Sequence, residues 1–288
     1  LENEVNKIFF LENIRFYEQE ERNDEEFAKK LSSFGEIFVN DAFSCSHRKH
    51  ASVDKITKFL PSYCGIQMNA EVNALKKVTS DIQKPIACII GGSKISTKIS
   101  VIKNLLPKFE KIIIVGAMAN NVIKYKGFNV GNSIIENNCN NIIEEIFSLA
   151  KKNTCEIIFP KDVAVGKKLD DKAKIKDLSD IQDDDIILDI GPKTISLINS
   201  ILENSKSVLW NGPAGYFENT NFAIGSEEIG KKIVSLGNKI YSVAGGGDTI
   251  AVINKINALK KFNFVSTAGG AFLEYLEGKE IPGIRALN

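Results

Sequence analysis

The sequence predicts an α/β protein of two domains, each a parallel sheet flanked by helices. Short apolar runs typical of strands alternate with segments that carry apolar residues at helical spacing along almost the whole chain. The strand runs are apolar throughout, as expected for strands that are covered on both faces. From Pro85 onward several of these runs end in glycine. Because ligands of open α/β sheets bind outside the carboxyl ends of the strands, these glycines indicate where a site lies.

The order of the elements places one domain boundary. The predicted strands are residues 7–11, 36–39, 85–90, 111–115, 156–160, 186–190, 207–210, 239–243 and 263–267. Residues 65–81 are predicted to form one helix, with no strand before Pro85. We therefore expect residues 1–64 in a first domain, 65–81 as an interdomain helix and 82–279 as a second domain.

Composition excludes several classes of protein. The 288 residues include 37 Lys plus Arg and 36 Asp plus Glu, a balance that argues against holding nucleic acid or an anionic membrane by bulk charge. The five cysteines are scattered without a CxxC pair, which favours a reduced, cytoplasmic protein. No apolar run approaches the roughly 18 residues of a membrane-spanning helix. The chain begins at Leu1 instead of Met, which suggests a fragment or a processed chain.

A glycine pair and two lysines follow the strand predicted at residues 85–90. The segment reads GGSKISTK, and its lysines, Lys94 and Lys98, are four residues apart and share one face of a helix. Glycine amides at a helix start together with lysines suit a phosphate chain. The spacing is not that of a P-loop. The alternative is that both lysines belong to a solvated helix face.

Three further segments follow strand ends in the second domain. The sequence GGGDT at residues 245–249 offers amide donors, and Asp248 a hard oxygen ligand for Mg²⁺; the alternative is a tight turn with Asp248 as the helix N-cap. The glycine pair Gly269 and Gly270 also follows a strand end, where a site is expected; the alternative is that it allows a helix to pack closely on the strand. In WNGPAGYFE, at residues 210–218, Glu218 could bind ribose hydroxyls, or be a surface residue beside a buried tryptophan.

The first domain carries two arginines after strand ends. Arg15 lies in ENIRF and Arg48 in NDAFSCSHRKH. The planar fork of a guanidinium can clamp a carboxylate or phosphate, although a lone arginine is usually a surface ion pair. His47 and His50 have no third metal ligand beside them, which favours a structural or substrate-adjacent role.

Seven segments, in order from Glu12 to the C-terminus, resemble phosphoglycerate kinases. They are ENIRF, VNDAFSCSHRKHAS, GGSKISTKISVI, LDIGPKT, WNGPAGYFE, GGGDT and STAGGAFLEYLEGKEIPG. The resemblance implies a hinge-bending kinase whose first domain binds phosphoglycerate, whose second binds Mg-nucleotide, and whose residues 280–288 pack back on the first domain. The family's opening DFNVP-type and HxGRP-type segments have no match here, so we expect an incomplete first domain.

The resemblance also implies roles for individual residues. Arg15 and Arg48 match phosphoglycerate ligands, and Lys94 matches the lysine that stabilises the transferring phosphoryl group. Gly269 and Gly270 match glycines whose amides face that group. The matching nucleotide-contact positions are Lys98, Asn211, Pro213, Glu218, Gly246, Gly247, Asp248 and Thr249, of which Asp248 is also the expected Mg²⁺ ligand. The VGAM at residues 115–118 departs from the family's usual GGGM, so we expect the adenine packing to differ in detail.

The predicted reaction is reversible phosphoryl transfer between 1,3-bisphosphoglycerate and ADP, giving 3-phosphoglycerate and ATP, a step of glycolysis. In-line transfer needs no general base, because neither a carboxylate nor an acyl phosphate has a proton to remove. One alternative is a nucleotide-binding fragment without turnover. A dinucleotide-dependent dehydrogenase is disfavoured, because no GxGxxG opens the first strand and helix. We expect a cytoplasmic monomer with Mg²⁺ as cofactor, ADP/ATP and phosphoglycerates as partners, and neither nucleic acid nor membrane.

Overall fold

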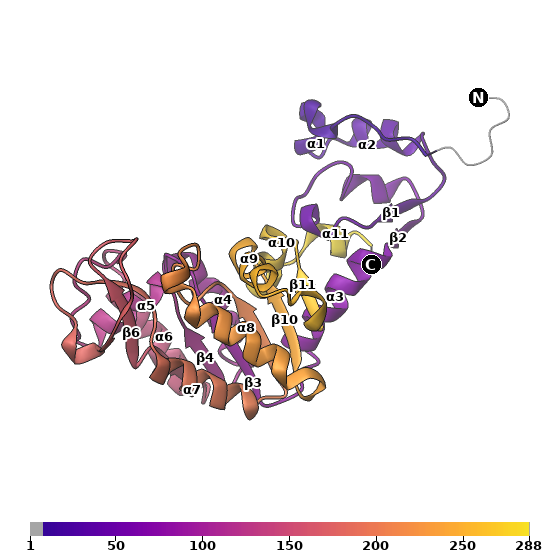
Figure 1. Ribbon diagram of the computed structural model, residues 1–288. Helices are drawn as coiled ribbons and strands as arrows, with labels where there is room; N and C mark the ends of the chain where they lie inside the picture. The colour runs from indigo at the N-terminus through magenta and orange to yellow at the C-terminus, as the bar shows by residue number, and fades with distance from the viewer. Residues whose placement is uncertain (1–7, 288) are drawn as a thin grey trace. The chain divides into compact units, whose positions relative to one another are not determined.

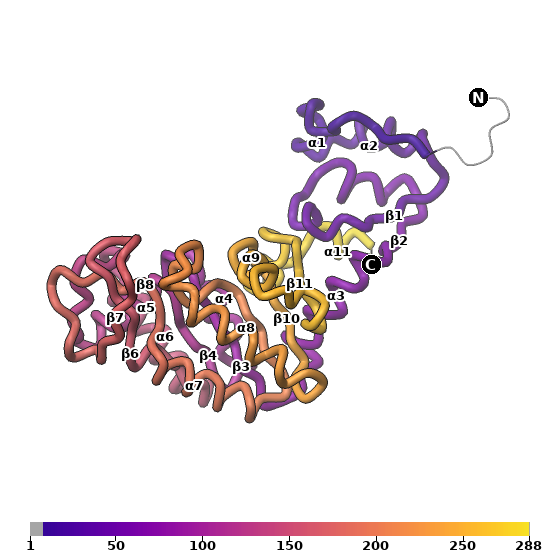
Figure 2. The backbone as a smooth tube through the Cα atoms, viewed as in Figure 1, coloured from indigo at the N-terminus to yellow at the C-terminus, as the bar shows by residue number. Residues whose placement is uncertain are grey.

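A computed structural model describes residues 8–287 of the chain, which divides into two compact units. Unit 1 consists of Leu1–Asn69 and Glu280–Asn288, and unit 2 of Ala70–Lys279. The helix α3 (Ile66–Thr79) begins in unit 1 and ends in unit 2. Figure 2 traces the backbone of both units.

Unit 1 contains a short parallel sheet and several short helices. Its elements are α1 (Glu18–Glu21), α2 (Glu25–Ser32), β1 (Phe38–Asn40), β2 (Ser62–Cys64) and α11 (Pro282–Arg285), and β1 pairs with β2 in parallel. The last of these helices is tied to residues far away in the sequence. The Gly283 N–H donates to the Ser46 carbonyl at 2.8 Å, and the Arg285 guanidinium pairs with Asp54 at 2.8 Å. The C-terminal stretch thus packs within unit 1.

The start of unit 1 differs from the sequence-based expectation. Lys7, the first residue of the strand predicted at 7–11, lies outside the described residues, and residues 8–11 are not in a strand. Their apolar side chains are exposed, with Phe10 at 96%. The apolar composition alone was misleading, because a strand also needs a partner to satisfy its backbone groups. The strand β2 was not predicted, since its residues Ser62, Tyr63 and Cys64 form no apolar run.

Unit 2 is built on a six-stranded sheet with the order β11-β10-β9-β3-β4-β5. Its strands are β3 (Ile86–Ile90), β4 (Lys111–Ile114), β5 (Glu156–Ile158), β9 (Ser207–Asn211), β10 (Tyr241–Gly245) and β11 (Phe264–Ser266). Every neighbouring pair in this sheet is parallel. All six carboxyl ends therefore lie along one edge, which confirms the predicted parallel α/β fold.

Helices pack in two groups around this sheet. They are α4 (Ile99–Leu105), α5 (Ala117–Tyr125), α6 (Asn140–Lys152), α7 (Pro192–Glu203), α8 (Ile224–Leu236), α9 (Gly247–Lys255) and α10 (Gly270–Leu276). α8 packs against both α7 and α9, whereas α4 packs against α10 and α6, and α6 also contacts α5. Figure 1 shows α7 and α8 running alongside the strands. Covering both faces explains why strands such as β3 are apolar at every position.

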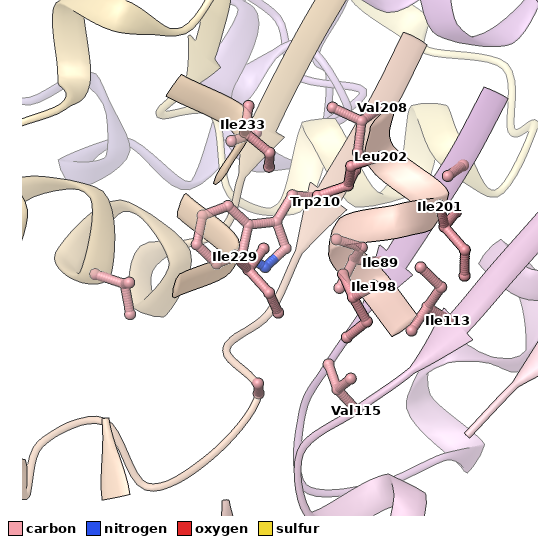
Figure 3. Packing of buried hydrophobic residues seen from close by; sticks show 14 of the residues in the cluster. Ile89, Ile113, Val115, Ile198, Ile201, Leu202, Val208, Trp210, Ile229 and Ile233 are labelled. Atoms are coloured by element: carbon pink, nitrogen blue, oxygen red, sulfur yellow. The ribbon is translucent and has the colours of Figure 1, made fainter. Parts of the chain in front are cut away.

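The core of unit 2 centres on the single tryptophan. Trp210 in β9 is fully buried and belongs to a cluster with Ile198 of α7 and Ile229 of α8; Figure 3 shows the indole ring beside Ile229. Its Nε1–H donates to the Gly212 carbonyl at 2.9 Å. The buried indole therefore has its polar atom satisfied and also holds the turn that follows β9.

A second, three-stranded sheet has the order β7-β6-β8. It consists of β6 (Asp162–Gly166), β7 (Lys174–Asp177) and β8 (Ile186–Ile190), and β6 pairs with both neighbours in the antiparallel sense. β8 was predicted as a strand, but the sequence did not indicate its antiparallel pairing. β6 and β7 were not predicted. Because strand pairing joins residues distant in sequence, the apolar pattern of β8 alone does not reveal its partner.

Candidate active site

Glycines shape the carboxyl edge of the six-stranded sheet. Gly91 follows β3 and Gly212 follows β9, and a Cβ added at either position would come within 2.3 Å of the other's loop backbone. Gly212 also has a φ of 108°, in the region that favours glycine. The ends of β3 and β9 thus approach each other as closely as only glycine allows.

A chain of hydrogen bonds links three strands at this edge. Lys98 Nζ donates to Asn211 Oδ1 at 2.5 Å, and Asn211 Nδ2 donates to the Gly245 carbonyl at 2.7 Å. The Gly212 N–H donates to Thr249 Oγ1 at 2.7 Å. Three of the predicted nucleotide-binding residues, Lys98, Asn211 and Thr249, therefore lie in one network.

The predicted second lysine is partly enclosed. Burial lowers the pKa of the Lys98 ammonium, whereas the Glu277 and Asp248 carboxylates act in the opposite direction. The structure thus disagrees with the alternative of a solvated helix face for Lys98. A positive charge removed from water in this way is suited to bind a phosphate.

The helix that follows β10 begins at a glycine turn. Gly246, with a φ of 98°, is the N-cap of α9, and no side chain caps the helix. Asp248 lies inside the first turn, so the alternative of Asp248 as N-cap is wrong. The free amides at Gly247 and Asp248 leave a helix N-terminus available to an anion.

A cavity of about 570 Å³ opens beside this edge. It is lined by three predicted site residues, Pro213, Glu218 and Asp248, and by residues that sequence reasoning missed. The missed residues are mainly apolar and include Ile134, Val163, Leu169, Ile187 and Tyr216. Two of them lie in β6 and β8, of which only β8 was predicted as a strand, and their position beside the site depends on the antiparallel sheet. The volume and apolar lining are those of a pocket for a small organic ligand.

The remaining predicted residues of unit 2 lie on loops around the edge. Lys94 is exposed, and its carbonyl accepts a hydrogen bond from Thr97 Oγ1 at 2.8 Å. Gly269 is the N-cap of α10 with a φ of 55°, and Gly270 is the first residue of that helix. A Cβ at Gly269 would meet nothing within 4 Å, so its backbone conformation, and not packing, requires glycine there.

Asp248 is the residue that the sequence predicted as a metal ligand. It is exposed and lines the cavity at the start of α9. In residues 8–287, no group of three or more His, Cys, Asp or Glu forms a metal site of its own. The single Asp248 carboxylate fits Mg²⁺, which commonly takes one or two carboxylates and completes its shell with water and substrate phosphates.

Unit 1 brings the two predicted arginines to one neighbourhood. Burial lowers the pKa of the His50 imidazole, Glu20 opposes this, and both Arg15 and Arg48 lower it further. Both guanidinium groups are thus within electrostatic reach of the same ring, and both residues are exposed. Nδ1 of His47 is buried without a hydrogen-bond partner among the described residues. Each of these two exposed guanidinium groups can receive an anion.

One protein-family model matches nearly the whole chain. The model described as phosphoglycerate kinase matches residues 2–279. The chain belongs to the phosphoglycerate kinase family. The predicted fold and the predicted function, a kinase that transfers phosphate to a carboxyl acceptor, are therefore confirmed, and the alternatives of a non-catalytic nucleotide-binding fragment and of a dehydrogenase are not favoured.

Individual relatives agree with this assignment. A phosphoglycerate kinase of Wolbachia pipientis from Culex pipiens is 46% identical over 97% of this chain and 72% of its own length. The Caulobacter vibrioides phosphoglycerate kinase is 43% identical, with the same coverage. The structure of the Coxiella burnetii phosphoglycerate kinase has a TM-score of 0.91 at 36% identity, covering 96% of this chain and 71% of that one. The Pyrococcus horikoshii enzyme follows with 0.79 at 29% identity and the same coverage.

Proposed function

We propose that this phosphoglycerate kinase binds ADP or ATP with Mg²⁺ at the carboxyl edge of the six-stranded sheet in unit 2. The observation that carries the proposal is the Lys98–Asn211–Gly245 network beside the 570 Å³ cavity. The enclosed Lys98 ammonium and the uncapped start of α9 suit the phosphates, and the apolar wall of the cavity suits the adenine. Pro213 and Glu218 line the same cavity, and we assign Glu218 to the ribose.

Mg²⁺ is the cofactor that this arrangement favours. Asp248 would hold the ion together with nucleotide phosphates, and the ion would neutralise charge on the phosphoryl group as it moves. Thr249 and the amides of Gly246 and Gly247 complete the loop around the phosphates. This set of ligands is supported by the position of all four residues at the start of α9.

Lys94, Gly269 and Gly270 act on the transferring phosphoryl group. Lys94 is an exposed cation on the loop that also carries Lys98, and the two glycines open α10. Donors and positive charge aimed at a moving phosphoryl group stabilise its transition state without a covalent intermediate. Arg15 and Arg48 of unit 1 bind the phosphoglycerate, which their exposure and their common electrostatic effect on His50 support.

The surroundings of the enzyme are part of the same proposal. All five cysteines are free, which supports a reducing compartment such as the cytoplasm. No helix within residues 8–287 has the length and apolar character to cross a membrane. We assign a monomer with nucleotide and phosphoglycerate as its partners, without nucleic acid or membrane.

Calorimetric titration of Mg-ADP tests the nucleotide site. We expect Lys98→Met to weaken binding, because it removes an ammonium that faces phosphate, whereas Lys103→Met on α4 should bind normally. Lys103 is a matched control, because its ammonium pairs with Glu145 at 2.6 Å on the helix surface. Equal binding by both variants would remove Lys98 from the site.

A second titration separates the two acidic residues. Glu218→Gln should weaken ADP binding with or without Mg²⁺, whereas Asp248→Asn should weaken it chiefly when Mg²⁺ is present. The same dependence on Mg²⁺ in both variants would contradict this division of roles.

A further inference from the structure

We propose that Glu136 is a positioning residue that holds the loop carrying Lys94 and Lys98 in its active arrangement. Glu136 lies in the connection between α5 and α6, 40 residues from the loop. No sequence motif pointed to it. The inference rests on the roles proposed above for the two lysines.

The contact joins both oxygens of one carboxylate to one residue of the loop. Glu136 Oε2 accepts from the Ser96 N–H at 3.1 Å, and Oε1 accepts from Ser96 Oγ. Ser96 lies midway between the two lysines and is the first residue of a 3-10 turn, Ser96–Lys98. No side chain at the N-cap position, Ile95, caps this turn. The carboxylate of Glu136 therefore takes the place of a cap and fixes the start of the turn from outside.

Charge adds to this geometry. The Ser96 hydroxyl and N–H lower the pKa of Glu136 and outweigh the opposing effect of burial, and the Lys94 ammonium adds a smaller lowering effect. The carboxylate is therefore ionised at neutral pH and attracts Lys94. A fixed negative charge at the start of a helical turn is also the favourable sign for the turn's dipole.

Glu136 is itself held in place. Its N–H donates to Asn121 Oδ1 at 3.0 Å, and its carbonyl accepts from Cys139 Sγ at 2.8 Å. Asn121 is a buried residue of α5, only 5% exposed. On the other side of the contact, Ile95 is fully buried next to Ser96. The Glu136–Ser96 contact thus joins two anchored backbones, which is what precise placement of a catalytic loop requires.

Kinetics of variants of the enzyme test the role. Glu136→Gln keeps the shape but loses the charge and one acceptor, and we expect turnover to fall by on the order of 10²-fold, as for a misplacement of about 1 Å. Ser96→Ala should lower turnover in the same sense. Glu145→Gln, which removes a carboxylate of α6 paired with Lys103 on the surface, is the matched control and should keep normal turnover.

The decisive measurement repeats Glu136→Gln in the Lys94→Ala background. If Glu136 affects turnover by positioning Lys94, the Glu136→Gln change should lower turnover by less than about 3-fold when Lys94 is already alanine, because the effects of coupled residues are not additive. The same large factor in both backgrounds would indicate a merely structural residue and overturn the inference. If Glu136→Gln does not fold, the same comparison with Ser96→Ala in both backgrounds tests whether the contact acts through Lys94. Normal turnover of Lys94→Ala itself would refute the proposed role of Lys94, an outcome distinct from failure of the Glu136 cycle.

Discussion

Asp189 predicts an unusual dependence of stability on pH. It lies in β8, is 3% exposed and lines the 570 Å³ cavity. Its carboxylate accepts from the Gly225 N–H at 2.7 Å and from the Ile190 N–H at 2.9 Å. Burial raises the pKa of Asp189 to about 7, an effect to which the nearby Glu227 carboxylate adds and which the two N–H donors only partly oppose. We therefore expect Asp189→Asn to change how stability varies with pH.

The size of the effect follows from linkage. The folded protein holds this proton up to about pH 7, whereas the unfolded chain releases it near 3.8. The contribution of Asp189 to the free energy of unfolding is thus complete below the pKa of the unfolded chain and is lost as the pH rises to the pKa of the folded protein. At 1.36 kcal/mol per pKa unit, the loss is about 4 kcal/mol, of which roughly 3 kcal/mol falls above pH 5.

Urea denaturation at several pH values measures this contribution. Trp210 is the only tryptophan and is fully buried in unit 2, so its fluorescence reports the unfolding of the unit that contains Asp189. We expect the wild type to lose about 3 kcal/mol more than Asp189→Asn between about pH 5 and pH 8. Taking the difference between the two proteins cancels the other titrating groups. Parallel pH profiles would refute the reasoning, because they would mean that Asp189 titrates normally in the folded protein.

Three further changes have defined outcomes. Trp210→Ala should lower the free energy of unfolding by about 3–5 kcal/mol, measured by circular dichroism in urea, because it empties the centre of the core; a change below 1 kcal/mol would contradict that packing. Gly191→Ala should lower the free energy of unfolding although its φ of −90° suits alanine, because the added Cβ would lie 2.3 Å from Asp162 Cγ. This loss of stability should be smaller when Asp162 is already alanine, and an equal loss would point to another cause. Burial alone would raise the pKa of Asp185, but Lys176, the Gln182 N–H and Lys167 hold it at about 2, so its contribution to stability is present above pH 3.8 and is lost as the pH falls towards 2. Asp185→Asn should therefore destabilise more at pH 7 than at pH 3 in the same urea assay, opposite in sign to Asp189.

The local sequence determined most of the elements and the family. Strands such as β3 and β9 have both faces covered, so β3 is apolar throughout and β9 is apolar at its three central residues, and both runs are visible in the sequence itself. Glycines at the strand ends, such as Gly212, are required by backbone conformation and close approach, which are local properties. The seven segments that resemble phosphoglycerate kinases predicted Lys98, Asn211 and Asp248 as nucleotide-contact residues from the sequence alone.

Only the tertiary structure decided which distant residues meet. The antiparallel pairing of β6 with β8, which supplies the apolar wall of the cavity, joins runs whose patterns carry no information about their partner. The hydrogen bond between Lys98 and Asn211 spans 113 residues, and that between Glu136 and Ser96 spans 40. Residues 8–11 show the converse, since their apolar composition predicted a strand and they form none. Propensity acts over a few neighbouring residues, whereas strand pairing, enclosure of a charge and the anchoring of the loop at Ser96 arise when separate segments pack together.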